Sequence, residues 1–447
     1  MDLDIDNGAP LPLARAHVPV SVDARAGEFR TGRRTYTQQF NQLYQARLDE
    51  LKPHVRAEAR RRWEGVAWTE RVLNVDGPAR TYVIGTLFVE SPAKPSTLAQ
   101  VEKTRWLSDA QPPERYRGVD GAEVHLEDES GRIRLVGAAV EAATLASGVV
   151  AAVLGCETPD GRFEVADVCF AGMPPQRARA ASAADAFVAL VAGLNVTAER
   201  PVTLEMQLLA ELLCGSAGGA PDQALSAHVV QTLVVGPVVA MPPAPLGRTE
   251  DARANDRAPV QRLLDRVDAF LADVAAAMPL TLLPGRGDPT DASLPQQPLN
   301  PGMFPRCRRY SAFRTATNPT YLDVAGGTLL LAAAGQPVDD LARYATRGES
   351  PCALAAASLR WRHIAPSAPD TLWCYPFTDR DPFVVRESPH VYVVGGQPEF
   401  AVDCAQGPDG QQTRIVAVPD FSASHTAVLL NLRTLECRAV RIGAPAD

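Results

Sequence analysis

The chain has 447 residues, of which 46% are hydrophobic and 21% charged, and its formal net charge is −8. This composition is typical of a globular protein with room for two or three domains. The negative net charge argues against a protein that neutralises many phosphates of a nucleic acid by itself. It does not exclude a local basic patch. No apolar run is long enough to span a membrane and the N-terminus is not signal-like, so we expect a soluble, non-secreted chain without a membrane partner.

The first third of the chain divides into an arm and a helical segment. Residues 1–34 are rich in Pro, Ala, Arg and Asp without a hydrophobic period, which predicts a disordered arm. A helical segment is expected over residues 35–69, where Pro53 should break the helix or open a second one. Three consecutive cations, Arg60 to Arg62, lie near the end of this helical segment. A solvated helix end explains them better than a contact with DNA or an import receptor. The apolar stripe of this segment contains Tyr36, Phe40, Leu43, Tyr44, Leu48 and Leu51.

In residues 70–172, apolar and polar residues alternate in short runs, as they do in short β-strands. Five such runs predict a five-stranded barrel of the OB-fold type. Such barrels often bind single-stranded nucleic acid through exposed aromatic side chains. Here aromatic residues are few and Glu127, Asp128 and Glu129 form an acidic corner, so we expect the barrel to dock onto protein. The predicted strands are Tyr82–Val89, Glu123–Glu127, Arg132–Val136, Val149–Gly155 and Arg162–Phe170.

A linker is expected over residues 173–184, and a larger α/β domain over residues 185–447. Strands at Phe187, Val229 and Leu280 alternate with helices near residues 202–213 and 260–278, and the part from Thr328 is richer in strands. Two stretches rich in glycine and proline predict polar loops, namely Cys214–Pro221 and Met241–Pro259.

Four turns of this domain follow strands in the order found in calcineurin-like phosphoesterases. An active member would show Asp-x-His, Gly-Asp, P-G-N-H-[DE] and Gly-His-x-His there, which hold two metal ions. A two-metal site needs about six or more protein ligands, and only Asn195 and Asp288 of these positions could contribute. The sequence therefore predicts a retained fold with a degenerate site, no catalytic residues and no bound metal or cofactor. The positions are Gly193, Asn195, Gly236, Pro237, Gly285, Arg286, Gly287, Asp288, Gly396 and Pro398.

The cysteines and histidines do not supply a substitute site. The eight cysteines form no C-x-x-C pair and no Cys-His cluster, which predicts free thiols under reducing conditions. His363 has an apolar neighbour and no acidic residue nearby in the sequence, so we expect a structural histidine there. No nucleophile–base–acid triad and no P-loop are found.

Longer segments of the chain are more specific than these turns, and they include TYVIGTLFVESPAKPSTL, LEDESGRIRLVG, LPQQPLNPGMFP, RHIAPSAPDTLWCYPF, SPHVYVVGG and VPDFSASHTAVLLNLR. With these segments, nearly all of residues 35–445 resemble the small, or B, subunits of eukaryotic DNA polymerase delta. The resemblance implies an OB-fold β-barrel followed by an inactive calcineurin-like metallophosphoesterase α/β sandwich. It also implies a non-catalytic nuclear scaffold in DNA replication and repair. Its implied partners are the cysteine-rich C-terminal tail of a family B polymerase catalytic subunit and a third, mostly extended subunit. DNA would be contacted only indirectly or weakly.

Other functions stay open at this point. A divergent metallophosphoesterase or nuclease could use Asp288 and Asn195 with ligands that the sequence does not reveal. Within the same class, the chain could be the small subunit of polymerase alpha or epsilon, although LPQQPLNPGMFP and SAPDTLWCYPF favour delta. Sharing with the translesion polymerase zeta is also left open by the resemblance.

Overall fold

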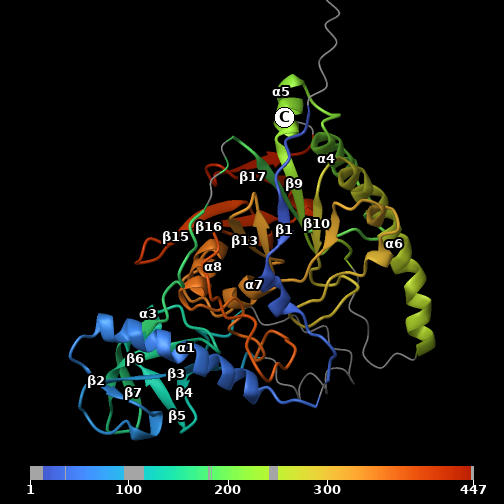
Figure 1. Ribbon diagram of the computed structural model, residues 1–447. Coiled ribbons are helices and arrows are strands. Elements are labelled where there is room, and N and C mark those ends of the chain that lie inside the picture. The colour runs from blue at the N-terminus through green and yellow to red at the C-terminus, as the bar shows by residue number, and fades with distance from the viewer. Residues whose placement is uncertain are drawn as a thin grey trace, which may run out of the picture.

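The computed structural model describes residues 14–35, 37–94, 115–179, 182, 184–240 and 250–443. Its strands form three six-stranded sheets, of which one closes into a barrel and two stack as a sandwich (Figure 1). The barrel lies at one end of the molecule and the sandwich makes up the rest. The predicted fold class, an OB-type barrel followed by an α/β sandwich, is confirmed.

The barrel closes because β3 pairs with β4 on one side and with β6 on the other, both antiparallel. Two glycines let the strands approach closely: a Cβ at Gly85 would lie 2.5 Å from the carbonyl oxygen of Glu127, and one at Gly155 would lie 2.0 Å from that of Glu164. The elements of this region are α1 (Asn41–Arg62), β2 (Ala67–Thr69), η2 (Val72–Asn74), β3 (Thr81–Glu90), β4 (Glu123–Glu127), β5 (Arg132–Val136), α3 (Ala138–Ala142), β6 (Val150–Glu157) and β7 (Phe163–Phe170).

The first sheet of the sandwich has the order β11-β10-β9-β8-β17-β18, and its four strands from β8 to β11 run parallel. Parallel strands covered on both faces are mostly apolar, and all seven residues of β9 are buried, five of them valine or leucine. The strands are β8 (Phe187–Ala192), β9 (Val229–Val235), β10 (Leu280–Leu283), β11 (Phe313–Thr315), β17 (Thr426–Asn431) and β18 (Cys437–Arg441).

The second sheet has the order β1-β12-β13-β14-β16-β15, with β13, β14 and β16 parallel at its centre. An apolar core between the two sheets includes Leu190, Val393 and Val416. The strands are β1 (Val20–Val22), β12 (Thr320–Val324), β13 (Thr328–Ala333), β14 (Val391–Gln397), β15 (Ala401–Gln406) and β16 (Gln412–Pro419).

Helices cover the outer faces of the sandwich. On the first sheet, α6 packs a buried apolar face that contains Leu264, Val267, Phe270, Leu271 and Val274. Over the second sheet, α8 contacts β14, β15 and β16. The remaining bounds are η1 (Ala24–Phe29), α4 (Leu204–Cys214), α5 (Ala220–Ala227), α6 (Glu250–Ala277), η3 (Pro301–Met303), η4 (Cys307–Arg309), α7 (Gln336–Ala342), α8 (Pro351–Arg360) and α9 (Phe421–Ser424).

The prediction of a disordered arm is wrong for residues 14–34. Strand β1 pairs antiparallel with β12, and the guanidinium of Arg15 donates hydrogen bonds to the carbonyl oxygens of Leu213, Ser226 and Val229. These partners are far away in the sequence, so a segment without a local hydrophobic period can still be held in place. Residues 1–13 lie outside the described part.

Two helix boundaries also differ from expectation. Helix α1 runs unbroken through Pro53, because Leu48, Leu51 and Val55 on its buried face hold it against the barrel while Pro53 is exposed. Helix α6 begins at Glu250, so residues 250–259 are helical rather than part of the expected Met241–Pro259 loop. Residues 241–249 and Tyr36 lie outside the described residues.

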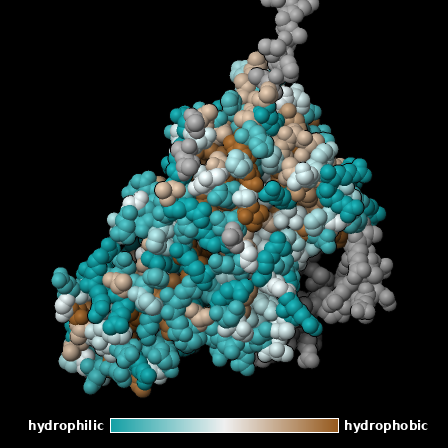
Figure 2. All heavy atoms as spheres, in the orientation of Figure 1, coloured by the Kyte–Doolittle hydropathy of each residue, from teal (hydrophilic) through white to brown (hydrophobic). Residues whose placement is uncertain are grey.

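The face of the molecule seen in Figure 2 is predominantly hydrophilic over the barrel, and apolar side chains gather near the far end of the sandwich. Among the helices of the described residues, none is long and apolar enough to cross a membrane.

Candidate functional site

The turns singled out from the sequence meet at the carboxyl ends of β8, β9, β10 and β14. Because β8, β9 and β10 run parallel in the first sheet, their carboxyl ends lie at one edge of the sandwich. The carboxyl end of β14, in the second sheet, lies at the same edge, since a Cβ at Gly395 would lie 2.7 Å from Val235 and 3.2 Å from Ala192. The backbone N–H of Gly193 donates to the carbonyl of Val235, and that of Asn195 donates to the carbonyl of Pro237. The structure thus brings the turns after β8 and β9 into direct contact.

Asp288 ties the turns after β9 and β10 together. Its carboxylate accepts hydrogen bonds from the backbone N–H groups of Val238, Val239 and Gly285, at 2.8 to 3.1 Å. Burial raises the pKa of Asp288 to about 7, while these three donors act in the opposite direction. The side chain is therefore used within the fold, as a cap on backbone donors.

Gly236 and Gly285 lie back to back beneath Asp288. A Cβ at Gly236 would lie 2.2 Å from the Gly285 nitrogen, and a Cβ at Gly285 would lie 2.4 Å from the Gly236 carbonyl carbon. Both contacts are with backbone atoms, which cannot move aside as a flexible side chain can. Any larger residue at either position would force the two turns apart.

The turn after β8 is closed by a carboxylate that the sequence analysis did not identify. Asp420 follows β16, and its Oδ1 atom would lie 1.7 Å from a Cβ at Gly193. Burial raises the pKa of Asp420, opposed by a hydrogen bond with Asn195. Asn195 also donates to the hydroxyl of Ser422 at 3.1 Å. The space beside Gly193 is thus filled from another strand.

The outer side of the site carries Arg286, Gly287 and Pro398, which are not buried. Gly287 and Gly396 have positive φ angles of 92° and 66°, which suit glycine. Asp339 from α7 lies nearby and is exposed. Gln397 donates to Asp339 at 3.3 Å and to the Gly395 carbonyl at 3.0 Å.

A buried network of amide side chains supports the turn after β10 from below. Gln296 donates to the carbonyl of Gly285 at 3.0 Å, and its own oxygen accepts from Asn318 and Gln336, both at 2.8 Å. Asn318 in turn accepts from the backbone of Ala334 at 2.9 Å. Gln296 belongs to the LPQQP segment, so this part of the motif has a structural role in the described fold.

Among the described residues, no group of three or more His, Cys, Asp or Glu side chains is arranged to hold a metal ion. Asp288 is occupied by backbone donors, and Arg286 brings a cation to the same edge. The structure therefore places the ten predicted positions together at one edge, in three turns that pack closely on each other and a fourth that lies beside Asp420.

A second feature, which sequence reasoning missed, joins the barrel to the sandwich. Arg47 of α1 and Asp381 are both fully buried, and Nε of Arg47 lies 2.7 Å from Oδ2 of Asp381. The same guanidinium donates to the carbonyl oxygens of Gly148 in the barrel and of Pro366 and Ala368 in the sandwich. One cation thus links three segments through hydrogen bonds.

His363 completes this buried cluster and confirms the expectation of a structural histidine. Its Nε2 lies 2.8 Å from Asp381, and its Nδ1 accepts from the backbone of Ala365 at 3.2 Å. Burial and the neighbouring Arg47 lower the pKa of His363 to about 4. Burial raises the pKa of the Asp381 carboxyl, but His363 and Arg47 together hold it well below its usual range.

The hydrophobic core runs without a break across the same joint. One cluster of buried residues contains Val83 and Leu87 from the barrel together with Leu359, Trp361 and Phe383 from the sandwich. Polar contacts surround it, including Thr144–Glu349, Tyr116–Arg343, Arg362–Gly172 and Lys94–Asp370. The two domains therefore share one core.

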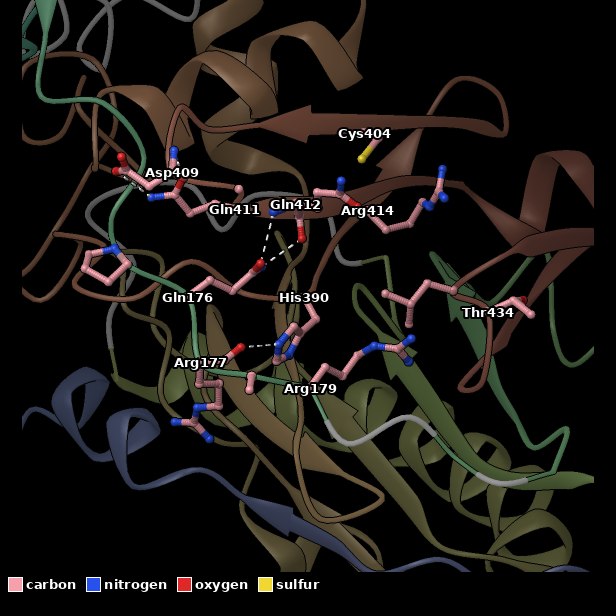
Figure 3. Close-up of a pocket in the computed structure, with 14 residues that line it drawn as sticks. Gln176, Arg177, Arg179, His390, Cys404, Asp409, Gln411, Gln412, Arg414 and Thr434 are labelled. Atoms are coloured by element: carbon pink, nitrogen blue, oxygen red, sulfur yellow. Dashed lines mark hydrogen bonds between the residues drawn. The ribbon is translucent and has the colours of Figure 1, made fainter.

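The first part of the expected linker crosses a groove of about 650 Å³ at the edge of the second sheet (Figure 3). The amide of Gln176 exchanges two hydrogen bonds with the backbone of Gln412, and the ring of His390 contacts the carbonyl oxygen of Arg177 at 3.0 Å. The guanidinium of Arg177 pairs with Glu387 and Asp323. Residues 175–179 are thus fixed to the sandwich.

Comparisons with known proteins agree with this architecture. Residues 39–168 match the family model described as the DNA polymerase delta subunit OB-fold domain, and residues 188–402 match the one that describes the B subunits of DNA polymerases alpha and epsilon. The DNA polymerase delta small subunit of Arabidopsis thaliana is 36% identical over 90% of this chain and 91% of its own length. The chain belongs to the family of DNA polymerase delta small subunits.

Other members of this small-subunit family are similar over equally long stretches. The DNA polymerase delta subunit 2 of Drosophila melanogaster is 33% identical over 94% of this chain and 96% of its own length. The DNA polymerase delta small subunit of Saccharomyces cerevisiae is 30% identical over 92% of this chain and 90% of its own length. The similarity thus spans the barrel, the joint and the sandwich.

Proposed function

We propose that this chain is a non-catalytic accessory subunit of DNA polymerase delta that acts in the nucleus in DNA replication and repair. In this role it links the cysteine-rich C-terminal tail of the catalytic subunit to a third subunit. Its membership in the small-subunit family supports the assignment to the polymerase complex. The continuous core and the buried Arg47–Asp381 pair support a scaffold role, because a scaffold must hold its partners at fixed positions.

One observation carries the proposal that the chain has no chemistry of its own. At Gly193, which takes the place of the Asp ligand after β8, a Cβ would lie 1.7 Å from Oδ1 of Asp420, so a ligand side chain has no space there. At other ligand places the chain has residues without a metal-binding side chain, namely Pro237, Gly287, Gly396 and Pro398. We infer a degenerate phosphoesterase site at Gly193, Asn195, Gly236, Pro237, Gly285, Arg286, Gly287, Asp288, Gly396 and Pro398.

The absence of activity can be tested directly on the purified chain. We expect no phosphodiesterase, phosphatase or exonuclease turnover above background with manganese, magnesium or zinc. Asp288→Ala should reduce stability, by roughly 2 kcal/mol or more, since several buried N–H groups lose their acceptor. Metal-dependent turnover that disappears in Asp288→Ala, while thermal unfolding shows the variant to be folded, would instead establish an active phosphoesterase.

The scaffold role is tested by reconstitution. This chain, the C-terminal tail of the polymerase catalytic subunit and the third subunit are mixed in pairs and together, and complexes are separated by size. We expect this chain to form a stable pair with each of the other two, and all three to elute together. If the tail and the third subunit associate without this chain, or if this chain retains neither, the proposed link is wrong.

A further inference from the structure

The outer face of α1 carries a stripe of three cations: Lys52, Arg56 and Arg60. They are spaced four residues apart, which places successive side chains about 6 Å apart along the helix. Together with Trp68 of β2 they line a groove of about 360 Å³. We call these three residues the α1 stripe.

No carboxylate lies within 4.0 Å of the charged nitrogens of the α1 stripe in the described part of the chain. Its neighbours at the end of the helix differ, since Arg61 pairs with Glu58 and Arg62 with Asp167. Asp49 also lines the groove, which therefore carries three cations and one anion; an oxygen of Asp49 accepts a hydrogen bond from Gln45 at 2.8 Å. Like charges four residues apart cost a few tenths of a kcal/mol each, so the stripe weakens the helix that carries it.

One member of the stripe is fixed in position before any ligand arrives. The guanidinium carbon of Arg56 lies 3.5 Å from the centre of the Trp68 ring, which is a close cation–π contact. The Nε atom of Arg56 is buried there without an acceptor among the described residues. Holding the guanidinium on the ring reduces the side-chain entropy that binding would otherwise remove.

From this arrangement we propose that the α1 stripe is a weak, sequence-independent contact for the phosphate backbone of double-stranded DNA. Cations spaced along a helix suit a row of phosphates, and the charge is complementary although the whole chain has a net charge of −8. Trp68 packs against the core beneath α1 and carries Arg56, so the ring is not free to stack on an unpaired base. This disfavours single strands. The proposal goes beyond the scaffold function and does not rest on it.

The test measures binding of the full-length chain to a short fluorescein-labelled duplex by anisotropy over a range of salt concentrations. Three phosphate contacts give a slope of log affinity against log salt of about −2.7, or a roughly 40-fold loss between 50 and 200 mM salt. The variant with Lys52→Gln, Arg56→Gln and Arg60→Gln should lose this dependence, leaving a slope near zero. The double variant Lys52→Gln, Arg60→Gln leaves the Arg56–Trp68 stack intact and should lose about two thirds of the slope.

A matched control removes three cations that are paired with carboxylates. Arg61→Gln, Arg62→Gln and Arg71→Gln change the net charge equally, and Arg71 lies 3.9 Å from Glu129. We expect this variant to bind DNA as the unchanged protein does. Equal losses in both triple variants, no salt-dependent binding by the unchanged chain, or tighter binding of a single strand of the same length would each overturn the proposal.

Discussion

At the scale of single residues, His363 gives the joint between barrel and sandwich a measurable dependence on pH. Its pKa falls from an ordinary value of 6.5 to about 4 in the folded chain. As the pH drops through this window, the unfolded chain takes up a proton that the folded chain does not, so stability is lost as the pH falls. The full effect is about 3 kcal/mol by pH 4.

The substitution His363→Gln tests this effect, because glutamine is neutral at every pH. We expect the variant to be less stable than the unchanged protein near neutral pH, since it fits the Asp381 and Ala365 contacts less well. The difference in the free energy of unfolding should then shrink as the pH falls, because only the unchanged protein loses stability through protonation of His363 in its unfolded state. Urea unfolding at a series of pH values measures both curves, and parallel curves would show that His363 does not titrate in this way.

Residues also mark the limit of what the sequence could predict about the site. Glycine and proline at four successive turns are visible in the sequence, and the structure brings these turns together at one edge of the sandwich. The sequence could not show that Asp420 lies beside Gly193, or that Gly236 meets Gly285 backbone to backbone. These contacts join distant segments, and no local spacing encodes them.

At the scale of elements, strands and helices with a strong period were predicted well, and elements held by distant partners were not. The alternating strands of the barrel and the apolar face of α6 follow directly from hydrophobic periodicity. Strand β1 has only three residues, and it forms because it pairs with the backbone of β12 at the edge of the second sheet. In α1, packing of the buried face outweighs the interruption expected from Pro53.

The turn before β6 offers a sharp test of how closely the two domains pack. Gly148 has φ +82°, and a Cβ there would lie 1.9 Å from the carbonyl oxygen of Pro366 in the sandwich. Gly161 has a similar φ of +75°, yet nothing lies within 4 Å of its Cβ position. Both substitutions to alanine carry the same kind of backbone strain, roughly 1 to 2 kcal/mol. Only Gly148→Ala adds a clash across the joint.

We therefore expect Gly148→Ala to destabilise the protein by roughly 3 kcal/mol more than Gly161→Ala, a cost typical of overpacking a buried contact. Urea unfolding of both variants measures the difference. Equal costs would mean that the turn at Gly148 and the segment at Pro366 can separate freely, which contradicts a tight joint.

At the scale of the whole molecule, the continuous core makes barrel and sandwich one cooperative unit. The linker adds to this, since Gln176 and Arg177 are hydrogen-bonded or ion-paired to the sandwich. Fluorescence and far-UV circular dichroism should then report the same unfolding transition, and trypsin should spare the bonds after Arg177 and Arg179. Release of two separately folded halves would contradict the single unit.

The substitution Arg47→Met tests how strongly the unfolding of the barrel is coupled to that of the sandwich. Methionine keeps much of the volume but leaves Asp381 buried with only His363 and the backbone N–H of Phe383 as donors. It also removes the hydrogen bonds to Gly148, Pro366 and Ala368. Losing one partner of a buried ion pair costs about 3 to 5 kcal/mol. In a single unit this loss shifts both spectroscopic transitions together to lower urea. In two loosely joined domains the substitution would instead separate the two transitions, with one domain unfolding at its original urea midpoint. That outcome would mean that the joint around Arg47 does not hold the two domains as a rigid scaffold.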